Sequence, residues 1–167
     1  KKGMVAMKGS YHGKSFGALS LTFNPKYRKA FAPLVEKVSF ASFGDMDSLR
    51  SAIDEDTALI ILEPIQGESG IIVAPDGFLQ EVRNLCNEKG ILLIFDEIQA
   101  GLGRTGRLWA GEHWNTTPDI LCLAKGIAGG VPMGATLVRP DILAAISKGE
   151  HSSTFGGNPI SCAAGIA

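Results

Sequence analysis

The stretch Ile91-Leu92-Leu93-Ile94-Phe95-Asp96-Glu97-Ile98-Gln99 decides the fold of this chain of 167 residues. Its first five residues form a continuous apolar run, which is typical of a strand buried on both faces of a sheet. A carboxylate that directly follows such a strand needs a cationic partner or several hydrogen bonds to keep its charge. The stretch therefore predicts a buried strand that carries Asp96 into a polar site.

Apolar runs of strand length recur along the chain, so residues 91–95 form one of several predicted strands. The others are rich in Ile, Leu and Val and cover residues 4–7, 35–40, 58–62, 120–124 and 135–138. Between residues 62 and 91 the apolar positions follow helical spacing, with Asp76 as the expected N-cap and Gly90 as the expected end. A shorter helix is expected over residues 45–54.

Strands that alternate with helices predict right-handed crossovers and an α/β fold, with a mainly parallel sheet flanked by helices. In such sheets ligands bind at the carboxyl ends of the strands. No linker or internal repeat is visible, and we interpret residues 1–167 as a single domain.

The composition argues against several classes of protein. The chain has 16 Lys and Arg against 17 Asp and Glu, a net charge of −1, and so lacks the basic field that attracts nucleic acid or anionic lipid. Its apolar runs are far shorter than the roughly 20 residues of a membrane helix. The cysteines Cys86, Cys122 and Cys162 lack the close spacing of metal sites, and we interpret them as reduced packing residues of a cytoplasmic protein.

Polar clusters follow four of the predicted strands, at residues 9–13, 63–68, 96–99 and 125–126. Because parallel strands end on one edge of a sheet, the four clusters are expected to converge on one site. The amine of Lys125 is expected to be desolvated there, or condensed with a carbonyl compound, and either state makes it a nucleophile. Taken singly, Asp96 could cap a turn and Lys125 could reach solvent from the surface.

Residues 101–106 match the dinucleotide fingerprint G-x-G-x-x-G. However, Asp96 and Glu97 separate this segment from the strand, and no clear helix begins after it. A nicotinamide-dependent oxidoreductase is therefore an alternative that depends on this segment alone. A non-catalytic amino-acid-binding module is a third alternative, and it would need none of Asp96, Gln99 and Lys125.

Taken together, five motifs resemble those of the class III, pyridoxal-phosphate-dependent aminotransferases of fold type I, especially the acetylornithine and ornithine branch. In sequence order they are Tyr11-His12-Gly13-Lys14-Ser15, Glu63-Pro64-Ile65-Gln66-Gly67-Glu68, Asp96-Glu97-Ile98-Gln99 with residues 101–106, Ala124-Lys125-Gly126, and Ser153-Thr154-Phe155-Gly156-Gly157-Asn158-Pro159. The resemblance implies the large, cofactor-binding domain of such an enzyme, incomplete at both ends, and pyridoxal 5'-phosphate as the cofactor.

The resemblance also implies roles for the residues around the cofactor ring. Lys125 would form an imine with the cofactor aldehyde and then carry the proton between carbons. Asp96 would pair with the protonated pyridine nitrogen, and Gln99 would donate to the phenolic oxygen. Tyr11 would cover the ring. His12 is a weaker candidate for stacking, and a neutral histidine in the core, or one that supports a cofactor-binding residue from behind, is the favoured alternative.

The remaining implied roles concern substrate and subunit contacts. Thr154 would reach the cofactor phosphate of the neighbouring subunit in a homodimer. Glu63 would lie near the phenolic side of the cofactor or act only as a structural acid. Glu68 would bind substrate indirectly, by pairing with an arginine that recognises the α-carboxylate of glutamate. That arginine and the main phosphate loop are expected outside residues 1–167.

The expected reaction is transfer of an ω-amino group from ornithine, N-acetylornithine or a similar diamine derivative to 2-oxoglutarate. Within the family, a 4-aminobutyrate or diaminopelargonate aminotransferase is the nearest alternative. An aminomutase is less favoured, because that branch usually lacks a glutamine at the position of Gln99.

Overall fold

The computed structural model describes residues 1–167. Its main feature is a six-stranded sheet with the order β2-β1-β3-β6-β7-β8. The strands are β1 (Gly3–Met7), β2 (Val38–Ala41), β3 (Thr57–Leu62), β6 (Leu92–Asp96), β7 (Ile120–Leu123) and β8 (Ala135–Val138). The first five pair in parallel and β8 pairs antiparallel with β7. The predicted mainly parallel sheet is therefore confirmed.

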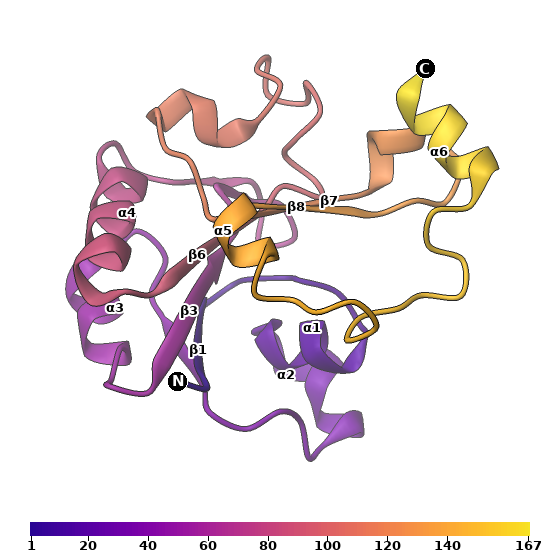
Figure 1. Ribbon diagram of the computed structural model, residues 1–167. Helices are drawn as coiled ribbons and strands as arrows, with labels where there is room; N and C mark the ends of the chain where they lie inside the picture. Colours follow the sequence, from indigo (N-terminus) through magenta and orange to yellow (C-terminus); the bar gives the residue numbers. More distant parts are fainter.

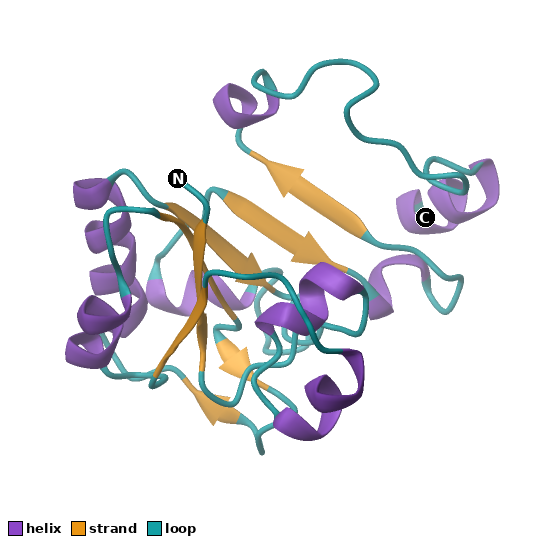
Figure 2. Cartoon of the chain, turned by 90° about the horizontal axis from the view of Figure 1, so that it is seen from below, coloured by secondary structure: helices purple, strands orange, loops and turns teal.

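Helices lie on both sides of this sheet (Figures 1 and 2). They are α1 (Phe16–Leu21), α2 (Pro25–Arg28), α3 (Met46–Ala52), α4 (Phe78–Lys89), α5 (Pro140–Leu143) and α6 (Pro159–Ile166), with 3-10 turns η1 (Lys29–Phe31), η2 (Ala110–Trp114) and η3 (Lys125–Ala128). In Figure 1, α3 and α4 lie on one side of the central strands and α1 and α2 on the other. A short hairpin of β4 (Ile65–Gln66) and β5 (Ile72–Val73) follows β3.

The core lies between the sheet and the helices α3 and α4. Alternate residues of three neighbouring strands, among them Met7, Ile60 and Phe95, join Leu49 of α3 and Leu79 of α4 in one cluster of 18 buried residues. Burial of this apolar surface is the main favourable contribution to folding. No helix of the chain combines the length and the apolarity that crossing a bilayer requires.

The boundaries of α4 correct one prediction. Asp76 is exposed, and the N-cap is Gly77, whose backbone is left-handed with φ of 80°. A left-handed residue at this position favours glycine, which carries no Cβ. The other end is as predicted, because Gly90 closes the helix with its N–H donating to the carbonyl of Cys86. In the shorter helix, Asp45 is the N-cap and its side chain accepts from the N–H of Ser48.

Two other predictions differ in detail from the structure. The strand expected over residues 35–40 is shortened to β2, because Lys37 adopts a positive φ of 58° that interrupts an extended chain. The last strand, β8, returns antiparallel because only the turn η3 and a short loop connect it to β7. A parallel return needs a crossover of a dozen or more residues, usually with a helix.

Candidate active site

The four polar clusters meet at the carboxyl edge of the sheet, as the sequence predicts. Their side chains surround a cavity of about 260 Å³, to which the loop after β1, the end of β3, the segment after β6 and the start of η3 all contribute. The lining residues are Tyr11, His12, Gly13, Glu63, Asp96, Ile98, Gln99 and Lys125. Residues 114 positions apart in the chain thus share one small cavity.

Asp96 ends β6 as a buried carboxylate, only 5% exposed. Its Oδ2 lies 2.8 Å from Nδ1 of His12, and its Oδ1 accepts from the backbone N–H of Ile98 at 3.1 Å. These are the hydrogen bonds that a carboxylate after a buried strand was expected to need. No Lys or Arg forms an ion pair with Asp96, so its negative charge stays available to a cationic ligand.

His12 therefore holds the carboxylate of Asp96 by a hydrogen bond, and its ring does more than fill space in the core. Its Nε2 is buried and has no hydrogen-bond partner. Its backbone N–H donates to Oγ1 of Thr22, the fully buried C-cap of α1, at 2.9 Å. This bond to Thr22 fixes the loop after β1 and so holds the ring of His12 against Asp96.

Glu63 ties together two of the loops that form the cavity. One carboxylate oxygen accepts from the N–H of Tyr11 at 3.0 Å, and the other accepts from the N–H of Gly67 at 3.2 Å. Burial raises the pKa of this carboxyl above its ordinary value, and the two N–H groups partly oppose that shift. Both carboxylate oxygens are thus engaged with backbone, as in the structural-acid alternative, although Glu63 does line the cavity.

Gln99 lies across the turn at Gly67. A Cβ added to Gly67 would fall 2.1 Å from Oε1 of Gln99, so only glycine leaves room for the amide at this point. The side chain of Gln99 is exposed and borders the cavity. Its amide is therefore positioned by close contact and is free to bind a ligand.

Lys125 corrects the expectation of a desolvated amine, because its side chain is exposed. It begins η3 with a positive φ of 48°, a backbone region that favours glycine. Strained backbone of this kind persists where surrounding structure enforces it, and such sites cluster at active centres. The strand β7 thus delivers an accessible amine to the same cavity as Asp96.

Three predicted site residues lie elsewhere or make other contacts. Tyr11 is half-buried and packs edge-on against Tyr27 with ring centroids 5.6 Å apart. Glu68 is exposed and lines a neighbouring cavity that also includes Tyr11. Thr154 is exposed in the loop before α6 and does not line the cavity of Asp96 and Lys125.

Glu97 is a buried residue of this region that the sequence did not single out. Its carboxylate accepts from the backbone N–H groups of Ala110 and Gly111 at 2.6 and 2.8 Å, and burial raises its pKa. A Cβ at Gly101 would come within 2.8 Å of the carbonyl oxygen of Glu97. Glu97 thus anchors the backbone at residues 110–111. The sequence signal that could have predicted this role was a pair of adjacent acids directly after a buried strand.

The fingerprint at residues 101–106 is therefore a structural feature. Gly101 makes room for Glu97, while Gly103 and Gly106 adopt positive φ values of 85° and 86° in consecutive turns. No helix begins after the segment until the short 3-10 turn η2. A dinucleotide site needs a helix N-terminus there, so the structure does not support the oxidoreductase alternative.

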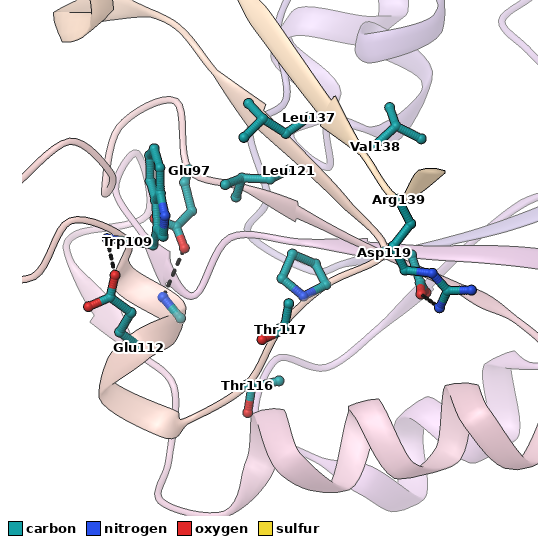
Figure 3. A pocket seen from close by; sticks show the side chains of 12 residues that line it. Glu97, Trp109, Glu112, Thr116, Thr117, Asp119, Leu121, Leu137, Val138 and Arg139 are labelled. Atoms are coloured by element: carbon teal, nitrogen blue, oxygen red, sulfur yellow. Dashed lines mark hydrogen bonds and ion pairs between the residues drawn. The ribbon is translucent and has the colours of Figure 1, made fainter. Parts of the chain in front are cut away.

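A second cavity, of about 330 Å³, lies beside β7 and β8 (Figure 3). Apolar side chains such as Leu121 and Leu137 line it, and its two buried acids, Glu97 and Asp119, already have hydrogen-bond partners. Asp119 accepts from Arg83 at 2.8 Å, from Arg139 at 2.5 Å and from the N–H of Leu93 at 2.7 Å. These bonds join the amino ends of β6 and β7, at the edge of the sheet opposite the candidate site.

The cysteines behave as packing residues. Burial raises the pKa of the Cys86 thiol to about 12 and that of Cys122 to about 11, which keeps both protonated near neutral pH. All three cysteines are free.

Comparison with known proteins identifies the family. The model of the class III aminotransferases matches residues 1–167. This chain belongs to the class III aminotransferase family. The acetylornithine aminotransferase of Methanopyrus kandleri is 52% identical over 160 residues, which is 96% of this chain and 41% of that protein. Ornithine aminotransferase 1 of Staphylococcus saprophyticus is 49% identical, over 98% of this chain and 42% of that protein.

Solved structures of aminotransferases have the same fold. The ornithine aminotransferase of Toxoplasma gondii superposes with a TM-score of 0.94 at 38% identity, covering 98% of this chain and 39% of that one. A PLP-bound amine transaminase from an uncultivated Pseudomonas species superposes with a TM-score of 0.90 at 31% identity, covering 98% of this chain and 44% of that one. This class III aminotransferase chain thus spans about two fifths of the length of the curated relatives it matches.

Proposed function

We propose that the chain is the cofactor-binding part of a pyridoxal-phosphate-dependent enzyme that transfers the ω-amino group of an ornithine derivative to 2-oxoglutarate. One observation carries the proposal. The strands β6 and β7 place the buried carboxylate of Asp96 and the exposed amine of Lys125 on one cavity. Relatives named as acetylornithine and ornithine aminotransferases support the class of donor.

The groups around the cavity fit pyridoxal phosphate. Asp96 is a buried carboxylate without a Lys or Arg partner, which suits the cationic pyridine nitrogen. The exposed amide of Gln99 suits the phenolic oxygen, and the half-buried ring of Tyr11 suits a flat aromatic ligand. The amine of Lys125 suits the aldehyde.

When bound, the cofactor supplies an aldehyde for the amino group and a cationic ring that withdraws electrons from the reacting carbon. Asp96 would pair with the ring nitrogen, and His12 would keep the carboxylate in place through its Nδ1. Nζ of Lys125 would hold the aldehyde group, and as a free amine it would accept and donate protons beside the substrate.

We further propose that the whole protein is a homodimer in which Thr154 binds the cofactor phosphate of the neighbouring subunit. The exposure of Thr154 and its position away from the cavity of its own chain support this assignment. In the purified whole protein, Thr154→Ala should weaken cofactor affinity without dissociating the dimer, as measured by equilibrium dialysis and light scattering. Unchanged affinity would remove Thr154 from the phosphate site.

The test is a donor screen on the whole protein. With pyridoxal phosphate and 2-oxoglutarate present, ornithine or N-acetylornithine should yield glutamate, which is measured by chromatography. 4-Aminobutyrate and diaminopelargonate are the competing donors in the screen. Preferred use of either one would reassign the substrate, while no glutamate from any donor would refute the proposed reaction.

A further inference from the structure

Residues 98–109 form an irregular loop that begins after Glu97 and returns to the turn η2. We call this segment the Gln99 loop. It consists of turns and bends, without a helix or strand. Gln99 lines the candidate active site, and the same loop forms most of the wall of an adjoining cavity of about 290 Å³ that also includes Lys125. The position of the Gln99 loop therefore shapes both of these cavities.

Glu97 joins the two ends of the Gln99 loop. Its side chain is only 1% exposed and points toward η2 (Figure 3). The carboxylate accepts from the backbone N–H groups of Ala110 and Gly111, which follow the loop directly. The backbone carbonyl of Glu97 accepts from the N–H of Gly101 at 2.9 Å and closes the turn of residues 97–101, with Gln99 at its centre. One buried residue thus holds both the start and the end of the loop.

The closure of the loop depends on the carboxylate of Glu97. No Lys or Arg forms an ion pair with it. Two backbone N–H groups instead converge on its two oxygens, and hydrogen bonds to a charged acceptor are about twice as strong as those between neutral groups. A glutamine has one acceptor oxygen in place of two, and its NH₂ group would face an N–H donor. An amide at this position therefore loses one of the two bonds.

The turn that carries Gln99 packs directly on Glu97. A Cβ added to Gly101 would fall 3.1 Å from Oε2 of Glu97. On its other side, the Gln99 amide fits only because Gly67 has no side chain. A shift of the turn would therefore move the amide relative to the rest of the cavity.

We propose that Glu97 is a positioning residue for the cofactor: it closes the Gln99 loop and so holds the Gln99 amide where that amide donates to the phenolic oxygen. The inference rests on the proposed function, and it adds a residue that does not line the cavity of Asp96 and Lys125. A donor to the phenolic oxygen stabilises its negative charge and lowers the pH at which the bound cofactor loses its proton. Misplacing the amide should therefore raise that pH.

The test is a pH titration of the visible absorbance of the whole protein loaded with pyridoxal phosphate. Gln99→Ala and Glu97→Gln should each raise the transition by about one pH unit, the shift expected when one hydrogen bond to a charged group is lost. The double variant should match Gln99→Ala alone, because Glu97 acts through Gln99.

Glu112→Gln is the matched control. The carboxylate of Glu112 is exposed and accepts from the N–H of Trp109 at 3.2 Å, at the start of the same turn η2. Its replacement changes a carboxylate bound to backbone beside the loop without touching the buried closure. We expect the absorbance transition of this variant to stay at the wild-type pH.

The outcomes separate this inference from the proposed function. A shift in Gln99→Ala without one in Glu97→Gln, or a double variant whose shift is the sum of the two single shifts, would overturn the inference alone. An unchanged transition in Gln99→Ala would refute the cofactor contact of Gln99 in the proposed function, and the inference with it.

Hydrogen exchange of the cofactor-free whole protein tests the loop closure by itself. In Glu97→Gln the amides of residues 110 and 111 should exchange at least about tenfold faster than in the wild type, whereas Glu112→Gln should leave them unchanged. Should Glu97→Gln fail to fold, Glu97→Asp keeps the charge and withdraws the carboxylate by one methylene, and it should show the same faster exchange and the same absorbance shift. Wild-type exchange in the folded variant would overturn the inference.

Discussion

Replacing His12 by Phe should destabilise the protein through Asp96. The two side chains are only 2% and 6% exposed, with Nδ1 of His12 2.8 Å from Oδ2 of Asp96. Phe fills a similar volume and provides no donor, so it leaves a buried carboxylate with the N–H of Ile98 as its recorded partner. Leaving a buried carboxylate short of one of its hydrogen-bond donors costs about 3 kcal/mol or more.

The remaining bond from Ile98 offsets part of that cost, and we expect a loss of about 3 kcal/mol in the free energy of unfolding. Asp96→Asn removes the buried charge, so adding His12→Phe to that variant should cost only about 1 kcal/mol. The coupling energy between the two residues should therefore be about 2 kcal/mol.

The assay is urea unfolding of wild type, both single variants and the double variant, followed by circular dichroism. His113→Gln, at an exposed histidine, is the matched control and should change stability by less than about 0.5 kcal/mol. A coupling energy below about 0.5 kcal/mol would show that His12 does not support the charge of Asp96, and the reasoning would fail.

Three further predictions concern the cavity and its supports. Lys125→Ala should leave the far-ultraviolet spectrum unchanged, because the side chain is exposed, and should lower transamination by at least about a thousandfold, as steady-state kinetics will test. Gly67→Ala should displace the Gln99 amide, whose Oε1 would lie 2.1 Å from the new Cβ, and should reproduce the cofactor absorbance spectrum of Gln99→Ala; a wild-type spectrum would contradict this. Burial raises the pKa of Glu63 and Glu97 above the ordinary value of 4.5, so the stabilising contribution of these shifts is complete below pH 4.5 and is lost as pH rises through the folded pKa. Glu63→Gln should therefore make the urea midpoint fall less steeply with rising pH above 4.5, and an unchanged slope would refute the assigned shift.

The strands at the centre of the sheet could be predicted from sequence because they are buried on both faces. The apolar runs at β3, β6 and β7 are continuous, so these strands have no polar face. A run of this kind and length is typical of a buried strand. β2 was predicted less well, because the backbone of Lys37 leaves the extended region. The hydrophobicity of a run does not indicate the backbone angles of a single residue within it.

Convergence of the site was predictable for the same reason. A parallel sheet places the residues after each strand on one edge, so Asp96 and Lys125 had to lie close once their strands were recognised. The partner of Asp96 was not predictable, because the contact between His12 and Asp96 joins the loop after β1 to the end of β6, 84 residues along the chain, and β3 lies between the two strands. The signal for it was a histidine in the polar cluster that follows the first strand.

Exposure was harder to predict than position. Asp96 and Lys125 both follow apolar strands, yet one is buried and the other exposed. The difference depends on which loops cover each strand end. The position of a residue after a strand does not predict which loops these are. The glycines at residues 101–106 likewise could not be interpreted from their spacing alone. They have the spacing of a phosphate-binding loop, but their structural causes are a close contact with Glu97 and two turns.

The most direct test of the account is borohydride reduction of the whole protein loaded with pyridoxal phosphate, followed by peptide mass spectrometry. The account predicts that reduction fixes the cofactor onto the amine of Lys125 alone, and that Lys125→Ala abolishes the visible absorbance and the label together. A label on another lysine, or labelling that persists in Lys125→Ala, would contradict the assignment of this cavity as the cofactor site.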